Sequence, residues 1–113
     1  MWSTLKIILD NSIVMEYDRH TRLPGKQREF LAKMDFDMDE GVELNGKHYA
    51  DPDTLQRGKY VAINLLYAIQ MNNRSMMNAM CAYLITRLPT LKQVAAEQYA
   101  GEMTVKLNFD ASN

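Results

Sequence analysis

The sequence has few of the features that mark a secreted or membrane-bound protein. Cys81 is the only cysteine, so no disulfide can form within the chain and an oxidising compartment is not implied. The most apolar window, 60–71, spans 12 residues and contains Asn64, which makes it too short to cross a bilayer. The first residues lack the basic stretch, apolar run and cleavage site of a secretory signal. We therefore expect a cytoplasmic protein that does not bind membranes.

Residues that would carry catalysis or hold a metal are also scarce. His20, His48 and Cys81 lie far apart and lack the spacing of a zinc site. There is no Gly-x-Ser-x-Gly motif, and the five glycines do not cluster into a phosphate-binding loop. The acidic run from Asp35 to Glu40 fails the EF-hand template at its glycine and glutamate positions, so we expect a solvated loop there. These absences predict a protein that is not an enzyme and holds no metal or cofactor.

The net charge of −1 gives no overall attraction to nucleic acid, but the charge is unevenly distributed. Residues 19–34 carry five cations against Glu29 alone, and residues 35–53 carry seven acids against Lys47 alone. Two interpretations stay open. The two blocks neutralise each other on a solvated surface, or the cations of 19–33 bind the phosphates of a nucleic acid. The acidic block and the lack of aromatic residues over 18–29 weigh against nucleic-acid binding.

The longest feature is a proline-free tract over 54–88 whose apolar residues recur every three, four or seven positions, as on one helix face. A single helix of this length would run about 50 Å, whereas a compact domain of this size is about 34 Å across. The tract must therefore break or project onto another chain. The segment 72–75 favours a break, because Asn adopts the left-handed conformation and Ser75 can cap a new helix. The apolar face comprises Leu55, Ala62, Leu65, Leu66, Ile69, Met76, Met77, Met80, Leu84 and Leu88.

The three prolines divide the rest of the chain. Pro24, Pro52 and Pro89 each stand where a helix can begin, because a first-turn proline loses no needed hydrogen bond. We expect a short helix over 26–34 after the first proline. The long tract follows the second proline, and a last helix over 90–100 follows the third.

Strands are predicted where β-branched residues alternate with polar ones or flank a turn signal. Asp10-Asn11 and Asn45-Gly46 are the two turn signals, and Asn-Gly is the stronger of them. A helix over 4–20 is the alternative for the first hairpin. The expected strands are 4–9, 13–17, 42–44, 47–49 and 103–109. The sequence thus predicts one α+β domain over 1–113, with short antiparallel hairpins packed on a helical core and a C-terminal edge strand.

The cluster of methionines near the expected helix break suggests a function. Methionine is pliable, so it fills irregular cores and also lines adaptable binding surfaces. We expect a small accessory or regulatory protein that acts through protein–protein contacts, as a homodimer and with an unidentified protein. A nucleic-acid-binding regulator that uses 19–33 is the alternative. The residues expected to contact a partner are Met76, Met77, Met80 and Leu84 on an apolar surface and Arg19, Arg22 and Lys26 on a charged one.

Overall fold

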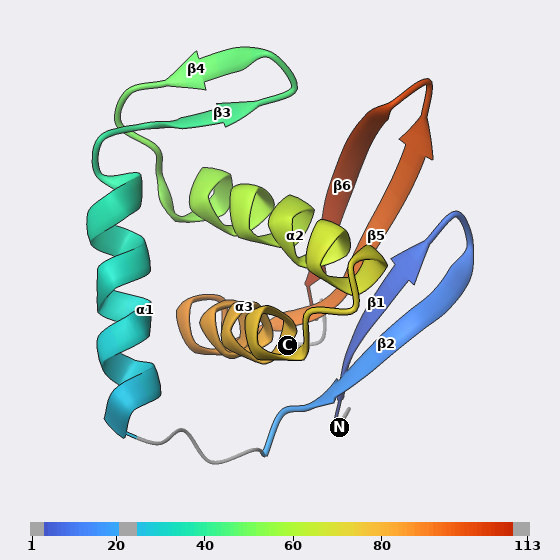
Figure 1. The fold of residues 1–113 in the computed structure, drawn as a ribbon, viewed down its shortest axis with the longest axis horizontal. Helices are drawn as coiled ribbons and strands as arrows, with labels where there is room; N and C mark the ends of the chain where they lie inside the picture. The colour runs from blue at the N-terminus through green and yellow to red at the C-terminus, as the bar shows by residue number, and fades with distance from the viewer. Residues whose placement is uncertain (1–3, 21–24, 110–113) are drawn as a thin grey trace.

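The computed structural model describes residues 4–20 and 25–109, which form an α+β fold (Figure 1). The fold class predicted from the sequence is confirmed, although one of its expected helices is a strand. In chain order the elements are β1 (Thr4–Leu9), β2 (Ser12–Asp18), α1 (Gly25–Met38), β3 (Val42–Leu44), β4 (Lys47–Tyr49), α2 (Thr54–Gln70), α3 (Arg74–Arg87), β5 (Leu91–Tyr99) and β6 (Glu102–Phe109).

Four strands form one mixed sheet in the order β2-β1-β5-β6, and β3 pairs with β4 in a separate hairpin. Strand β1 runs parallel to β5, with Lys6 opposite Gln93, while β1–β2 and β5–β6 are antiparallel. Helices α2 and α3 lie together against one face of this sheet (Figure 1). Leu5, Ile7 and Val94 are fully buried and belong to the core that the sheet and helices share. The C-terminal strand β6 lies at a sheet edge, as predicted.

The local turn signals are confirmed by the backbone. Asp10 and Asn11 both have positive φ, at 50° and 69°, and join β1 to β2, so a helix over 4–20 is excluded. Asn45 and Gly46, with φ of 52° and 81°, join β3 to β4 in the same way. Two successive residues with positive φ match the twist of an antiparallel hairpin, which is why Asn and Gly are favoured there.

The helix expected over 90–100 is wrong, because residues Leu91–Tyr99 form strand β5. Pro89 follows the end of α3 and does not begin a helix. The segment 95–98, Ala-Ala-Glu-Gln, has the composition of a helix, but all four residues pair with β6, and Ala95 and Ala96 also pair with β1. Burial of Leu91, Val94 and Ala96 against the helices outweighs this local preference.

The break predicted in the long tract is confirmed and lies between α2 and α3. Asn72 has a φ of 55°, the left-handed conformation that ends a helix. Asn73 caps α3, since its side chain accepts a hydrogen bond from the Met76 amide at 3.2 Å, so Asn73 takes the role expected of Ser75. The apolar face of the tract is mostly buried, whereas Leu55 at its start is 43% exposed.

Helix α2 begins at a complete capping box. Asp53 Oδ1 accepts a hydrogen bond from the Gln56 amide at 2.8 Å, and the Gln56 side chain accepts one from the Asp53 amide at 2.9 Å. Further along α2, Gly58 allows close packing, because a Cβ there would lie 2.6 Å from Leu88 Cδ1. These two features fix where α2 begins and how closely it meets the end of α3.

Helix α1 is longer than the 26–34 expected, since it ends at Met38 and includes the start of the acidic run. Asp35 and Asp37 therefore belong to a helix and not to a loop. Leu31 and Met38 are buried on its inner side, where α1 packs against α3. Figure 1 shows α1 running across the direction of α2 and α3. This crossing creates the groove described next.

Candidate protein-binding groove

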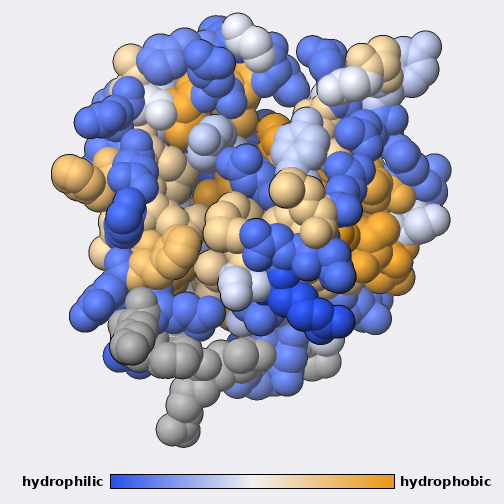
Figure 2. All heavy atoms as spheres, in the orientation of Figure 1, coloured by the Kyte–Doolittle hydropathy of each residue, from blue (hydrophilic) through white to orange (hydrophobic). Residues whose placement is uncertain are grey.

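An apolar groove lies where α1 crosses the α2–α3 pair. It encloses about 240 Å³. Figure 2 shows hydrophobic residues gathered between α1 and the other two helices on this face of the molecule. Asp37 is the one charged side chain in its lining, and Asn64 adds an amide. The lining residues are Phe30, Met34, Asp37 and Met38 of α1, Tyr60, Val61 and Asn64 of α2, and Met76 and Met80 of α3.

The lining of the groove is rich in aromatic residues and methionine. Aromatic residues and methionine are enriched in protein–protein interfaces, whereas charged residues are depleted at the interface core. Phe30 is 36% exposed, although it lies beside buried apolar side chains. Tyr67, another exposed aromatic residue, follows Tyr60 and Asn64 on α2 at helical spacing and extends the same surface. The lining thus offers apolar contact area with few groups that must lose water on binding.

A cluster of ionisable side chains centred on Asp35 fixes α1 to the other two helices that line the groove. Asp35 Oδ1 accepts a hydrogen bond of 2.5 Å from the Tyr83 hydroxyl, and Oδ2 accepts one of 2.8 Å from Arg87 Nε. Arg57 of α2 pairs with Asp35 at 3.4 Å and with Asp39 at 2.6 Å. This Asp35 cluster therefore joins α1 to both α2 and α3.

The pKa values in the cluster reflect these contacts. Partial burial acts to raise the pKa of Asp35, but the hydrogen bonds from Tyr83 and Arg87 and the charges of Arg87 and Arg57 outweigh it, so the pKa lies below its ordinary value. Burial, and then the bond to Asp35, raises the pKa of the Tyr83 hydroxyl. The bond to Asp39 raises the pKa of Arg57. Near neutral pH Asp35 is thus ionised beside a protonated Arg57 and a neutral Tyr83.

A second hollow, of about 510 Å³, opens beside the Asp35 cluster. Its charged lining residues are two arginines, Arg57 and Arg87, and two aspartates, Asp35 and Asp53. The charges balance, so the hollow has no net attraction for an ionic ligand. Three of the four side chains are already engaged with one another. We interpret this cluster as a structural anchor for α1.

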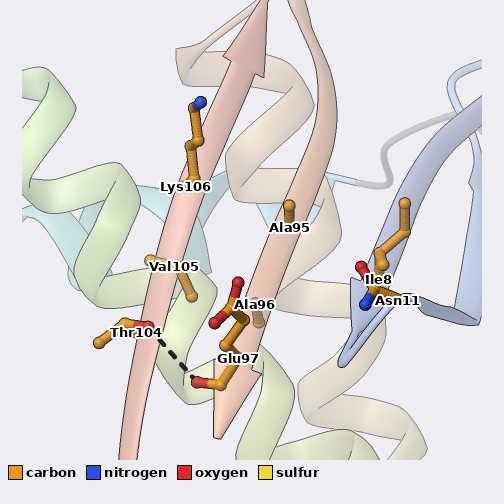
Figure 3. Close-up of a pocket in the computed structure, with 8 residues that line it drawn as sticks. All are labelled: Ile8, Asn11, Ala95, Ala96, Glu97, Thr104, Val105 and Lys106. Carbon is orange, nitrogen blue, oxygen red and sulfur yellow. Dashed lines mark hydrogen bonds between the residues drawn. The ribbon is translucent and has the colours of Figure 1, made fainter.

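A third hollow, of about 220 Å³, lies on the sheet face (Figure 3). Ile8 and Asn11 approach from β1 and its turn, while Ala95 of β5 leaves space because its side chain is small (Figure 3). Glu97 and Lys106 line it with opposite charges. The hollow therefore lacks the concentrated chemistry of a catalytic or ligand site.

The four apolar residues nominated from the sequence have different environments in the structure. Met76 and Met80 line the groove. Met77 is half-buried and packs against the core. Leu84 is fully buried, so it supports the core and does not reach the surface. Of the nominated apolar set, Met76 is therefore the residue that is both in the groove lining and partly exposed, since Met80 is 8% exposed and belongs to the core.

Of the three charged nominees, the structure describes the side chain of Arg19 alone, and Arg19 is not among the residues that line the groove. Arg19 ties the end of β2 to the α3–β5 connection, since its guanidinium donates to the carbonyls of Leu91 at 2.5 Å and Pro89 at 2.6 Å. Burial lowers the pKa of Arg19. Arg22 lies outside the described residues, and Lys26 belongs to α1 with a side chain that is also outside them. The structure gives Arg19 a structural role.

Sequence reasoning missed the contributions of α1 and α2 to the groove. The sequence predicts a short helix over 26–34 but does not single out Phe30, Met34, Tyr60 or Asn64 as contact residues. The spacing of Tyr60, Asn64 and Tyr67 at four and then three positions is a sequence signal for one helix face. The crossing of α1 over α2 has no such local signal, because it depends on Asp35 and its distant partners.

No group of histidine, cysteine, aspartate or glutamate in the described ranges is arranged to hold a metal ion. Within the same part of the chain, no helix combines the length and apolarity needed to cross a membrane. Comparison with models of known protein families, with curated proteins and with solved structures finds no match for this chain.

Proposed function

We propose that this protein is a small, non-enzymatic accessory or regulatory protein that acts through protein–protein contacts. The groove between α1 and the α2–α3 pair is its binding surface, and its partners are a second copy of the chain and an unidentified protein. The observation that carries this proposal is the concentration of Phe30, Met34, Tyr60, Met76 and Met80 around one partly open groove. We expect it to act in the cytoplasm, where Cys81 would stay reduced.

The absence of enzymatic activity is supported by the state of the reactive groups. Cys81 is buried, and this burial raises the pKa of its thiol to about 12, so it is not a nucleophile at neutral pH. Tyr83, Arg57 and Arg87 are engaged with Asp35. The alternative of nucleic-acid binding has less support, because Arg19 donates to backbone carbonyls and α1 carries Asp35 and Asp37.

Site-specific photocrosslinking in the source cell tests this proposal. A photoreactive benzoylphenylalanine replaces Tyr67 on α2 beside the groove, or replaces Tyr99 at the β5–β6 turn as the matched control. Tyr99 is 85% exposed, so general accessibility favours the control position. We expect protein adducts from position 67 and few from position 99. Adducts mainly from position 99, or adducts from position 67 that nuclease digestion removes, would contradict the proposal.

A further inference from the structure

The charge order along α1 is the reverse of what stabilises a single helix. No acidic residue lies in its first turn and no basic residue in its last turn. Glu29 is the single acid of α1 before Lys33; Arg28 and Lys33 precede Asp35 and Asp37, and Asp39 follows the helix directly. The helix dipole favours acids near the amino end and bases near the carboxyl end. Asp35 and Asp39 are bonded to Arg57 and Arg87, whereas Lys33 and Asp37 pair with each other on the exposed side of α1.

Asp37 lines the groove, and Lys33 lies one helical turn before it on the exposed side of α1. They belong to a stripe with Phe30 and Met34 at spacings of three, four and seven. Lys33 Nζ lies 3.1 Å from Asp37 Oδ2, and their side chains are 74% and 62% exposed. An exposed pair of this kind contributes little to the stability of one chain. The stripe therefore presents two apolar side chains and one charge of each sign to the outside.

We propose that the groove binds the α1 helix of a second copy of this chain, with the two α1 helices antiparallel about a two-fold axis beside Asp35. In this arrangement Lys33 of each copy faces Asp37 of the other, so the two-fold axis generates two equivalent ion pairs between the chains. Phe30 of each copy lies toward Met38 of the other copy, at the end of that other copy's groove. The two Met34 side chains meet near the axis. This inference rests on the proposed function, because it names one occupant of the same groove.

Antiparallel self-pairing fits the observations better than other occupants do. The stripe is its own electrostatic complement, because reversing one helix places its basic half against the acidic half of the other. A nucleic acid would meet Asp37 and Asp39 and be repelled. Methionine can adapt to an identical neighbour at a symmetry axis. A second copy thus explains the charge order and the apolar lining together.

Two charge-reversed variants test the pairing. Lys33→Asp and Asp37→Lys each break the pair within the chain and place like charges across the dimer. We expect each variant alone to self-associate at least about tenfold more weakly than the unmodified chain in sedimentation equilibrium. An equimolar mixture, with one variant isotope-labelled, should restore the dimer as a heterodimer in native mass spectrometry. Because the intrachain pair is broken in both variants, only contacts between chains can cause this restoration.

The matched control reverses charges on the open sheet face, where Lys6 of β1 is the register partner of Glu16 of β2. Lys6→Asp and Glu16→Lys should leave self-association unchanged. A disulfide test fixes the geometry independently: Met34→Cys should crosslink two copies under mild oxidation. Met71→Cys should not, although Met71 is 78% exposed.

A monomeric unmodified chain at about 100 µM, or a mixture that associates no better than either variant, would overturn the α1 pairing. Adducts from position 67 to a different protein would still support the proposed function in that case. A monomer that also gives no adduct from position 67 would contradict both proposals.

Discussion

The hydroxyl of Tyr83 donates a 2.5 Å hydrogen bond to Asp35 Oδ1 and joins α3 to α1 across 48 positions of the sequence. Arg87, one helical turn after Tyr83, binds the other carboxylate oxygen of Asp35 at 2.8 Å. One carboxylate thus holds α1 against α3, and the position of α1 sets the groove.

Asp35→Asn should lower the free energy of unfolding by about 1–3 kcal/mol, because Arg57 and Arg87 lose their shared anion in a partly buried site. Urea denaturation monitored by circular dichroism measures the change. Asp51→Asn, the same substitution at an exposed position, is the control and should change stability by less than about 0.5 kcal/mol. Equal effects of the two substitutions would show that Asp35 is not an anchor.

The anchor also predicts how stability depends on pH. The pKa of Asp35 in the folded chain lies below its ordinary value of 3.8, so the unfolded chain binds the proton more readily. The contribution of Asp35 is therefore fully present above about pH 4 and is lost as the pH falls through the folded-state pKa. Urea midpoints of the unmodified chain and of Asp35→Asn, measured at pH 6, 4 and 3, should move closer together as the pH falls. Parallel curves over this range would contradict the assignment.

Leu84 and Met76 should respond differently to truncation, although both were nominated as partner contacts. Leu84 is fully buried, so Leu84→Ala should cost about 2–5 kcal/mol of stability. Met76 is half-buried in the groove lining, so Met76→Ala should cost less than about 1.5 kcal/mol but weaken self-association. Chemical denaturation and sedimentation equilibrium separate the two effects. A larger loss of stability for Met76→Ala would place Met76 in the core.

Cys81 should be unreactive in the folded protein. Its thiol is buried and its pKa is raised to about 12, so almost no thiolate forms at pH 8. Labelling with a thiol reagent should proceed at the rate of unfolding and should accelerate in urea as the unfolded fraction rises. Rapid labelling in native buffer would show an accessible thiolate and weaken the case against covalent catalysis.

The sequence was most informative where the signal lies in adjacent residues. Asn45-Gly46 and Asn72-Asn73 marked a hairpin and a helix break because their backbone preferences are local. Strand β5 was missed because its partners β1 and β6 are distant, and pairing with both overrides the helical composition of 95–98.

The same distinction holds for the site. Met76 and Met80 were predicted from the spacing within one helix, whereas Phe30 and Tyr60 reach the groove from other elements. Asp35 and Arg87 are 52 positions apart, and no pattern in either neighbourhood indicates their contact. The spacing of residues within one helix can be seen in a single sequence, whereas the way two distant helices cross cannot.

Methyl NMR of the protein labelled on its nine methionines tests the central claim most directly, because these residues lie both in the groove and away from it. Spectra recorded on dilution from about 500 to 10 µM report which methyl groups contact another chain. The account predicts concentration-dependent shifts for Met34, Met38, Met76 and Met80, which line the groove. Met15 and Met103 of the sheet should not shift. Shifts confined to these two sheet residues, or none at any methionine, would contradict a self-binding groove.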